Sequence, residues 1–508
     1  MNLSAISKLC TAIAVLIFAN LAVTSNDTIK NNARADMRLS GNDSLQSILA
    51  LQGNINAVLN DKELHTAKYG LCVYSLSSKK SIYQRSSKSL LTPASNTKLF
   101  TSFAALNYLG EHFNLRSSVY CNREAIKDGV LEGNIYIYGR GDINLSTADI
   151  EDLAQQIKNY GITKIKGHIC ADESFFDKDY YRRSYSGDNE DVEATGPIYP
   201  LTVEKNLINV LVKASARTGV AANVQIIPSS SSFVVRNLTR VGYLGKKNPN
   251  GSTIKVSIKT DSNKTYITVS GVISPNKTGY YSYFNNLPAI TVAGVLKDRL
   301  GVVGVKVDGS ASVASYGNIH DENAVEVANI ERPLTDIMYL VNKKSDNFLA
   351  EMMFKIVGGN YGKYPNTAQS AREKVKQVLS ENSIEHTGFK LNDGCGLSRR
   401  NLVTPDALLK MLITAKYKSY GSTLDSTLAI AGVDGTLRKR MIGTRAENNL
   451  RAKTGTLRNA SALSGYVRAQ SGELLAFSFI FNGPSVGYYK QKENMIGVLL
   501  ADFNYTKH

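Results

Sequence analysis

A serine and a lysine one helical turn apart constrain this chain more than any other feature. Residues 94–100 read Ala-Ser-Asn-Thr-Lys-Leu-Phe, which places Ser95 and Lys98 three positions apart at the start of an apolar run. Side chains at this spacing share a helix face, so the hydroxyl and the amine come within hydrogen-bond reach. Pro93 suits the first turn of a helix and Gly110 suits its end. The sequence therefore predicts a buried helix with a serine mounted at its N-terminus, where free N–H groups favour negative charge.

Two later motifs give this pair a chemical meaning. They are Ser345-Asp346-Asn347, and Lys453-Thr454-Gly455 followed by Thr456. A serine hydroxyl is a weak nucleophile until a base removes its proton, and without a histidine motif the base has to be an amine. A Ser-x-x-Lys pair alone arises often by chance, but these three motifs in this order are typical of class A β-lactamases and penicillin-binding proteins.

The chain resembles the D-alanyl-D-alanine carboxypeptidase/endopeptidase family of low-molecular-mass penicillin-binding proteins, in the subgroup with a large insertion between the first and second motifs. The gap from Lys98 to Ser345 matches that subgroup and is far longer than in class A β-lactamases. Four further stretches carry the resemblance, at residues 139–142 (Gly-Arg-Gly-Asp), 393–399 (Asp-Gly-Cys-Gly-Leu-Ser-Arg), 432–437 (Gly-Val-Asp-Gly-Thr-Leu) and 453–457 (Lys-Thr-Gly-Thr-Leu). Ile143 stands where the family usually has proline, and Cys395 where it usually has serine. The likeness covers essentially the whole mature chain.

The resemblance and the element pattern together imply an α+β fold with a penicillin-binding protein/β-lactamase-like transpeptidase domain, in which helices pack on an antiparallel sheet. This catalytic domain would be discontinuous, with residues 26–116 and 332–508 on either side of a β-rich insertion. The insertion, residues 117–331, is expected to hold two small domains. Because the motifs on both sides must meet in space, we expect the two ends of the insertion to lie close together.

The resemblance assigns the chemical steps to five residues. Ser95 would be acylated, and Lys98 would be the base that accepts its proton. Lys98 has to be neutral for this, and both burial and the positive charge of Lys453 would lower its pKa. Ser345 would relay a proton between the two lysines and the leaving amine, while Asn347 would hold the amide of the acyl donor.

Substrate binding is assigned to the third motif and its surroundings. Thr454 would receive the terminal carboxylate of the substrate, and Gly455 would let the substrate lie close along the strand edge. The backbone N–H groups of Ser95 and Thr456 would form the oxyanion hole. Asp346 is expected to face away from the substrate and to brace its turn.

The resemblance also implies the substrates, which are peptidoglycan stem peptides ending in D-Ala-D-Ala, with β-lactams as acylating mimics and crosslinks as endopeptidase substrates. Asp172 and Arg399 match family positions that contact the far end of a diaminopimelate side chain, and a carboxylate with a guanidinium suits that zwitterionic group. The alternative is that both are surface charges in unrelated ion pairs. Two other functions stay open, a β-lactamase and a non-catalytic wall-binding scaffold, although the complete motifs oppose a scaffold.

The N-terminus and the charge balance indicate an exported protein. Residues 1–8 carry one positive charge and residues 9–23 are apolar, which predicts a signal peptide over residues 1–25, with cleavage after Ser25 or Ala35. An uncleaved anchor is the alternative. The formal net charge of +17 suits the anionic surface of a cell wall or membrane headgroups, and export opposes a nucleic-acid partner. We therefore expect a periplasmic or cell-envelope protein with at most peripheral membrane association.

Cysteine and histidine usage indicates no cofactor or metal. The histidines lack paired metal-ligand spacing, and no Cys-x-x-Cys motif occurs. After Cys10 leaves with the signal peptide, the mature chain keeps Cys72, Cys121, Cys170 and Cys395, which allow three disulfide pairings. Cys72 lies in a strand-like run and is expected to be a small buried apolar residue.

Periodicity predicts the remaining elements. In the catalytic part we expect helices over 43–60, 334–356, with the second motif near its middle, 367–381, 406–416 and about 491–501, and strands over 69–76, 81–84, 449–456, 462–469 and 474–481. In the insertion we expect short strands, one helix over 147–160, and a glycine turn at residues 139–142.

Overall fold

The computed structural model describes residues 45–188, 196–245, 251–314, 323–359 and 366–504. The signal peptide predicted over residues 1–25 and both predicted cleavage sites lie outside these ranges. Within them, no helix has the length and apolar character needed to cross a membrane.

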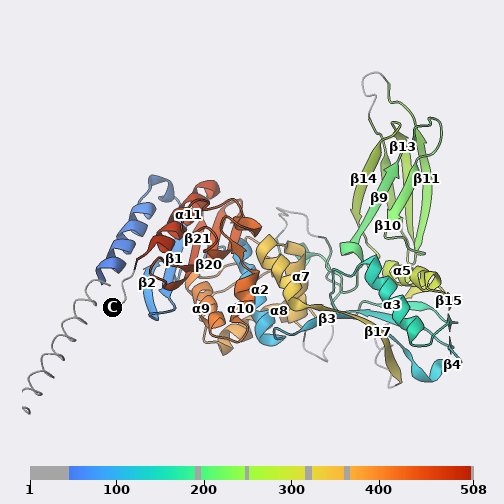
Figure 1. Cartoon of the computed structure of the whole chain (residues 1–508), viewed down its shortest axis with the longest axis horizontal. Helices are drawn as coiled ribbons and strands as arrows, with labels where there is room; N and C mark the ends of the chain where they lie inside the picture. The colour runs from blue at the N-terminus through green and yellow to red at the C-terminus, as the bar shows by residue number, and fades with distance from the viewer. Residues whose placement is uncertain (1–44, 189–195, 246–250, 315–322, 360–365, 505–508) are drawn as a thin grey trace, which may run out of the picture.

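A six-stranded antiparallel sheet forms the centre of the catalytic part (Figure 1). In spatial order its strands are β18 (Ala429–Ile430), β19 (Arg451–Leu457), β20 (Ala460–Arg468), β21 (Leu474–Asn482), β1 (Lys68–Ser75) and β2 (Lys80–Arg85). The three C-terminal strands pair as predicted. The pairing of β1 with β21 sets Lys68 opposite Asn482, so the two ends of the chain build one sheet.

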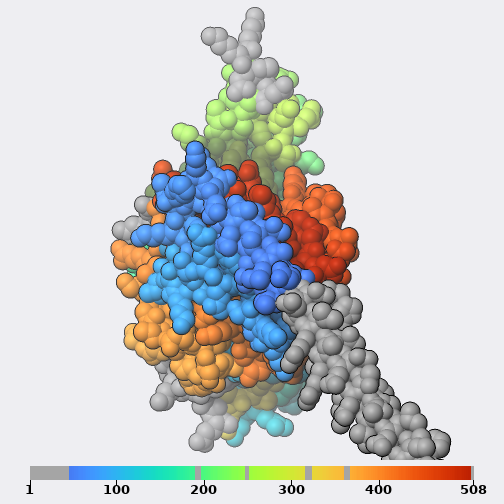
Figure 2. All heavy atoms as spheres, turned by 90° about the vertical axis from the view of Figure 1, so that its left-hand side faces the viewer, coloured from blue at the N-terminus to red at the C-terminus, as the bar shows by residue number. Residues whose placement is uncertain are grey.

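Helices cover both faces of this sheet. On one face, residues 45–59 and α11 (Val486–Asp502) enclose a core with Phe477, Phe479 and Phe481, whose alternation along β21 puts all three rings on the same side. Figure 2 shows this end of the molecule, where N-terminal and C-terminal residues share one face. The opposite face carries α2 (Thr97–Tyr108), α8 (Ala368–Glu381), α9 (Pro405–Lys416) and α10 (Gly421–Thr427). The α+β class is therefore confirmed.

The helix predicted over residues 334–356 is wrong at the second motif. The chain forms α6 (Leu334–Tyr339) and a π-helical turn η5 (Leu340–Lys344), and then leaves the helical conformation at Ser345, whose φ is 62°. A new helix, α7 (Asn347–Val357), begins after Asp346, whose side chain accepts a hydrogen bond from the N–H of Leu349. The apolar spacing continues across the break because both helices pack on the same core, so periodicity could not reveal it.

The insertion contains a second sheet, whose strands lie side by side in the order β16-β8-β6-β3-β17. Its strands are β16 (Ala311–Val313), β8 (Ile169–Asp172), β6 (Ile135–Gly139), β3 (Asn114–Asn122) and β17 (Ala324–Pro333), and two helices, α3 (Thr147–Asn159) and α5 (Pro288–Val302), share its core. The prediction of a single helix in the insertion is wrong, because the insertion also contains α5 and the short helix α4 (Arg182–Ser186). Most residues of α5 are buried, so this helix lacks the polar stripe that marks an amphipathic helix.

Two three-stranded sheets form the lobe that projects away in Figure 1, and a small sheet lies beside the α3 and α5 layer. The strands of the lobe are β10 (Asn223–Ile227), β9 (Leu207–Lys213) and β14 (Thr278–Phe284), then β11 (Phe233–Val241), β13 (Thr265–Ile273) and β12 (Lys255–Thr260). The small sheet has β15 (Lys306–Val307), β7 (Lys164–Ile165), β5 (Val130–Leu131) and β4 (Ile126–Lys127). The short elements are α4 (Arg182–Ser186), η1 (Lys62–Leu64), η2 (Ala94–Asn96), η3 (Arg123–Ala125), η4 (Glu204–Asn206) and η6 (Gly435–Leu437).

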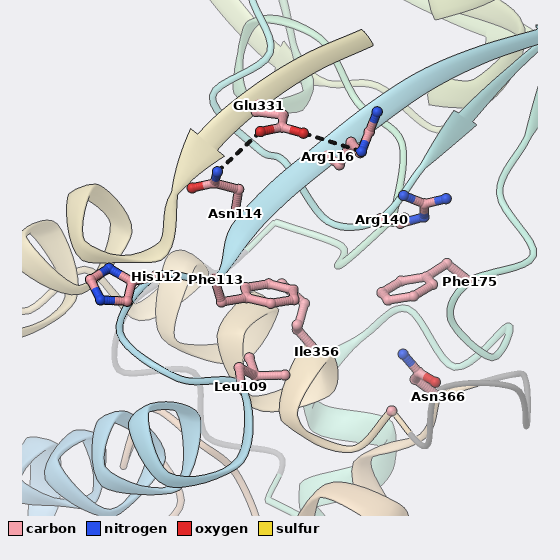
Figure 3. Close-up of a pocket in the computed structure, with 11 residues that line it drawn as sticks. Leu109, His112, Phe113, Asn114, Arg116, Arg140, Phe175, Glu331, Ile356 and Asn366 are labelled. Atoms are coloured by element: carbon pink, nitrogen blue, oxygen red, sulfur yellow. Dashed lines mark hydrogen bonds and ion pairs between the residues drawn. The ribbon is translucent and has the colours of Figure 1, made fainter. Parts of the chain in front are cut away.

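The insertion is joined to the catalytic part through two paired strands. β3 and β17 run antiparallel, with Arg116 opposite Glu331, so the chain leaves and returns side by side. Glu331 accepts a hydrogen bond from Asn114 Nδ2 at 3.0 Å and pairs with Arg116 at 3.2 Å, beside a cavity of about 370 Å³ (Figure 3). The ends of the 117–331 segment are thus adjacent, as expected, while its division into domains stays a prediction.

Two smaller expectations can be compared with the structure. All four cysteines of the described chain, Cys72, Cys121, Cys170 and Cys395, are buried and free, so none of the three possible disulfide pairings is formed. Residues 139–142 make the expected turn, in which Gly141 has a φ of +92° and Asp142 pairs with Arg332 at 3.1 Å. A side chain at Gly141 would also meet Ile356 of α7.

Candidate active site

Ser95 lies on a strained turn that leads into a buried helix. The turn η2 precedes α2 directly, and Ala94 has a φ of 47°, in the left-handed region that residues other than glycine seldom adopt. Ser95 is partly exposed, whereas Lys98, one turn further along, is 0 % exposed. The fold therefore presents the hydroxyl to solvent and keeps the amine in the protein interior.

Three acceptors surround the amine of Lys98. Its Nζ lies 3.0 Å from Ser95 Oγ, 2.7 Å from Asn347 Oδ1 and 2.6 Å from the carbonyl oxygen of Cys395. The predicted contact between Ser95 and Lys98 is present, and the second motif meets the first through Asn347. The Cys395 carbonyl was not predicted, because nothing in the sequence shows which backbone group a distant loop will bring to a side chain.

A second serine–lysine pair lies beside the first. Lys453 Nζ donates to Ser345 Oγ at 2.9 Å and to the carbonyl oxygen of Thr454 at 3.0 Å. Lys453 is also 0 % exposed, so both amines have lost nearly all contact with water. The three sequence motifs thus converge on one site with two hydroxyls and two buried amines.

Burial is the main cause of the altered pKa values of both lysines. Desolvation lowers the pKa of Lys98, although nearby acidic groups, Asp393 and Glu351 among them, oppose the change. Desolvation lowers the pKa of Lys453 well below its usual value, and the positive charge of Lys98 lowers it further. The two buried ammonium groups repel each other, so their proximity disfavours the doubly protonated pair.

The second motif is held in place by the N-cap of α7. Asp346 Oδ1 accepts the N–H of Leu349 at 2.9 Å, so its carboxylate braces the turn as expected and leaves Ser345 and Asn347 to face the lysines.

We expect Asp346→Ala to cost about 1 kcal/mol of stability, as the loss of an N-cap does, and also to slow acylation by penicillin. The matched control is Thr367→Ala at the N-cap of α8, where the hydroxyl accepts the N–H of Ser370 at 2.9 Å. Both variants should lower the melting temperature, but only Asp346→Ala should lower the acylation rate. Equal acylation rates in the two variants would contradict this role of the cap.

The third motif packs directly against the turn of Ser95. A Cβ atom on Gly455 would lie 2.6 Å from the carbonyl oxygen of Pro93, so the missing side chain here serves the contact between β19 and η2. Thr454 is 8 % exposed and donates to the hydroxyl of Thr436 at 2.8 Å, while Thr456 is exposed. Thr436 was not assigned a role from the sequence, although it belongs to the family-like stretch at residues 432–437.

The insertion reaches the edge of this site. A cavity of about 340 Å³ opens beside Ser345 and Asn347, and its other wall includes Lys205 of η4 and Phe284 of β14, both in the insertion. Ile143, which stands in place of the usual proline of the family, lines the same cavity.

Asp172 and Arg399 are held by different parts of the chain. Asp172 ends β8 and is 0 % exposed; one of its oxygens accepts the N–H of Ser174 at 2.8 Å, and the other meets no hydrogen-bond donor within the described residues. Arg399 is half-buried, and its backbone N–H donates to Asp188 at 2.8 Å. A protein contact thus holds the side chain of Asp172 and the backbone of Arg399, and the role of the two residues in substrate recognition stays a prediction.

Comparisons with known proteins agree with the geometry. The model of the D-Ala-D-Ala carboxypeptidase 3 (S13) family matches residues 51–502. A D-alanyl-D-alanine carboxypeptidase from an Actinomadura species is 30 % identical over 465 residues, which cover 89 % of this chain and 85 % of that protein. One from Haemophilus influenzae is 25 % identical over 442 residues, or 86 % of this chain and 90 % of that protein. The crystal structure of penicillin binding protein 4 from Haemophilus influenzae is similar in fold, with a TM-score of 0.68 and 24 % identity over 89 % of this chain and all of that one.

Proposed function

Because this chain belongs to the D-Ala-D-Ala carboxypeptidase 3 (S13) family and is a serine-type D-alanyl-D-alanine carboxypeptidase, we propose that its substrates acylate Ser95, with Lys98 as the general base. The observation that carries the proposal is the set of contacts around Lys98 Nζ. A neutral amine has two N–H bonds and one lone pair. If the two N–H groups bind Asn347 Oδ1 and the Cys395 carbonyl, the lone pair faces Ser95 Oγ, which would then donate its proton.

Acylation then follows from the same contacts. Ser95 Oγ attacks the carbonyl carbon of the penultimate D-alanine while its proton passes to Lys98, and the N–H groups of Ser95 and Thr456 bind the oxyanion. The proton next has to reach the nitrogen of the departing D-alanine. Ser345 is suited to relay it, because its hydroxyl lies 2.9 Å from Lys453 Nζ and the residue belongs to the same motif as Asn347, which contacts Lys98.

Hydrolysis of the ester repeats these steps with water as the nucleophile. Lys98 takes a proton from water as the water oxygen attacks the acyl carbon, and the Ser95 oxygen leaves with a proton returned by Lys98. The net reaction is peptide plus water giving a shortened peptide and free D-alanine. Peptidoglycan is thus the substrate and β-lactams are ligands, and we propose that β-lactams acylate the same hydroxyl.

The third motif would orient the substrate. Thr454, next to the side chain of Lys453, is suited to bind the terminal carboxylate, to which its hydroxyl would donate the proton that it gives to Thr436 in this structure. The demand for a free carboxylate beside the scissile bond favours C-terminal D-alanine and hence stem peptides ending in D-Ala-D-Ala. We further propose that the enzyme is exported to the periplasm or cell envelope, where this substrate is found.

The proposal is tested by release of D-alanine from a diacylated Lys-D-Ala-D-Ala peptide, measured together with acylation by a fluorescent penicillin. We expect turnover of the peptide and a long-lived penicilloyl adduct. Rapid loss of the adduct would favour a β-lactamase, and labelling without peptide turnover would favour a scaffold. Cleavage of a D-alanyl crosslinked dimer in the same assay reports endopeptidase activity.

A separate prediction concerns recognition of the diaminopimelate side chain of the substrate. If Asp172 and Arg399 bind the zwitterionic end of a diaminopimelate side chain, then Asp172→Ala and Arg399→Ala should each lower kcat/KM for a D-Ala-D-Ala peptide with that end free by about tenfold or more, and much less for one with the end capped. The measurement is kcat/KM for both peptides with each variant. An equal loss on the two peptides, or none on either, would show that these residues do not read the side chain.

A further inference from the structure

A buried glutamate lies directly behind the amine of Lys98. Glu351 is 0 % exposed and sits one turn after Asn347 on α7, so both side chains share the face that is directed at the first motif. Asn347 contacts Lys98 directly, at 2.7 Å. Glu351 is linked to it through the backbone of Cys395: Glu351 Oε1 accepts the N–H of Cys395 at 2.6 Å, and the carbonyl oxygen of Cys395, in the next peptide group, accepts Lys98 Nζ, also at 2.6 Å.

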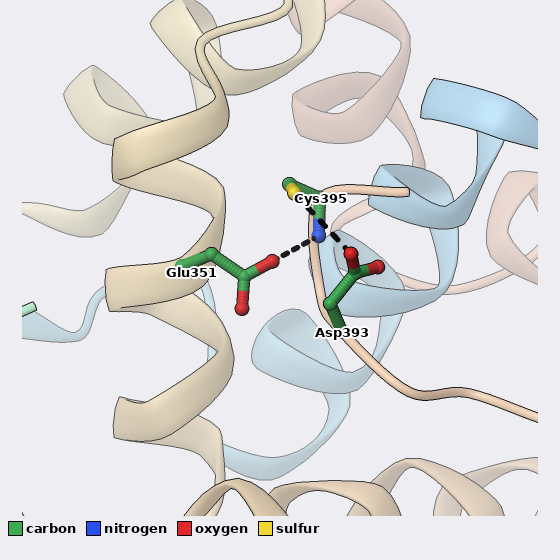
Figure 4. A group of neighbouring side chains, drawn as sticks. All are labelled: Glu351, Asp393 and Cys395. Carbon is green, nitrogen blue, oxygen red and sulfur yellow. Dashed lines mark hydrogen bonds between the residues drawn. The ribbon is translucent and has the colours of Figure 1, made fainter. Parts of the chain in front are cut away.

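Several hydrogen bonds hold the surrounding loop, and they limit the freedom of the Cys395 backbone. Figure 4 shows Glu351 on its helix, facing Asp393 and Cys395 on the loop. Asp393 binds the N–H groups of Gly396 and Ser398 and forms a fully buried ion pair with Arg182 at 3.0 Å.

The other oxygen of Glu351 accepts the hydroxyl of Tyr185 at 2.8 Å. Side chains of Glu351, Asp393 and Cys395 lie close enough to hold a metal ion, but their carboxylate oxygens are already occupied by hydrogen bonds. The cluster is therefore interpreted as a hydrogen-bonded support.

We propose that Glu351 is a positioning residue for acylation, which fixes the Cys395 carbonyl against Lys98 and whose charge controls how readily Lys98 loses its proton. This inference rests on the proposed role of Lys98 as general base. The link through the backbone accounts for the geometry, since Glu351 holds the N–H side of Cys395, and a shift of this residue would move the adjoining carbonyl, one of the acceptors that direct the Lys98 lone pair at Ser95.

The charge of Glu351 changes the pKa of Lys98 in a known direction. An ionised Glu351 favours the ammonium form of Lys98, and so raises the pKa of that lysine. Burial, followed by the charge of Asp393, raises the pKa of Glu351 to about 7, so its charge changes within the working range of an enzyme at neutral pH. The titratable and charged groups around Glu351 are Asp393 and Cys395 from the loop, Tyr185 and Arg182 from α4, Lys98 from α2, Lys355 on α7 and Arg372 on α8.

The variant Glu351→Gln removes the negative charge of this side chain but keeps a hydrogen-bond acceptor in its place. The amide oxygen of glutamine can still accept the Cys395 N–H, so we expect the rate constant for acylation by a fluorescent penicillin to stay within about threefold of wild type at its high-pH plateau. Loss of the negative charge should move the midpoint of the acid limb to lower pH by about one unit, the effect expected for a charge a few ångströms away in a protein. Glu351→Leu, which removes both acceptor oxygens, should lower the plateau at least about tenfold.

The matched control is Glu493→Gln, at a second glutamate that is 0 % exposed and whose pKa burial also raises, but which binds Ser461 and Arg440. It should leave the midpoint unchanged. An unchanged midpoint in Glu351→Gln, or an equal change in Glu493→Gln, would overturn the proposal.

A second variant decides the question if Glu351→Gln fails to fold. The Tyr185 hydroxyl lowers the pKa of Glu351, so Tyr185→Phe should keep Glu351 neutral to higher pH and move the midpoint in the same direction by a smaller amount. No movement would overturn the proposal. Failure of the base assignment itself is recognised separately, by wild-type acylation that survives in Lys98→Ala.

Discussion

Ser95→Ala is expected to abolish covalent labelling by penicillin and to lower D-alanine release by at least about 10³-fold, the scale of loss when a nucleophilic serine is removed. Ser95 is partly exposed, and its hydroxyl hydrogen-bonds Lys98, which keeps its bonds to Asn347 and Cys395. The change in unfolding free energy should therefore stay within about 0.5 kcal/mol. Labelling and melting temperature are measured on the same preparation.

The matched control is Ser102→Ala, on the same helix. Ser102 is fully buried and its hydroxyl hydrogen-bonds Asn342 at 3.2 Å, with no lysine involved. This variant should lose stability by about 1 kcal/mol and keep its labelling, which is the reverse of the Ser95→Ala pattern. Labelling retained in Ser95→Ala would show that another residue is acylated.

Lys98→Arg is expected to fail as completely as Lys98→Ala, with acylation slowed at least about 10³-fold in both. A guanidinium cannot lose its proton near neutral pH, so arginine would keep the positive charge and lose the lone pair that the mechanism requires. The rate constant for acylation is measured with the fluorescent penicillin across a range of pH. A simple need for positive charge would instead let arginine replace lysine.

Lys410→Arg serves as the control for this substitution. The exposed Lys410 forms an ion pair with the largely buried Asp406 at 2.8 Å on α9, where either cation can bind the carboxylate. This variant should acylate at the wild-type rate. Near wild-type acylation by Lys98→Arg would show that Lys98 is not the base.

The parts of the site that the sequence predicts are those set by local spacing. Ser95 and Lys98 lie one turn apart, so their contact follows from helix geometry alone. The contacts of Lys98 with Asn347 and with the Cys395 carbonyl join residues 249 and 297 positions away, and depend on how helices and loops pack. Motif order could indicate the first of these, whereas a backbone carbonyl leaves no signature in the side-chain sequence.

In the fold, too, elements set by nearby residues could be predicted, whereas those set by contacts between distant residues could not. The strands around 449–481 are joined by short turns, so the sequence predicts their antiparallel pairing, but the addition of β1 to β21 depends on a contact between the two ends of the chain. Helix α5 was missed because burial on nearly all sides removed its polar stripe. The break at Ser345 was missed because α6 and α7 keep one apolar face across it.

The most direct test of the mechanism is mass spectrometry of the wild-type enzyme after reaction with penicillin. The intact protein should gain the mass of one penicillin, and after proteolysis the added mass should fall on the peptide that contains Ser95. Fragmentation should then place it on that serine. An adduct on any other residue, or an enzyme that releases D-alanine from peptides yet forms no adduct, would contradict a Ser95 acyl-enzyme.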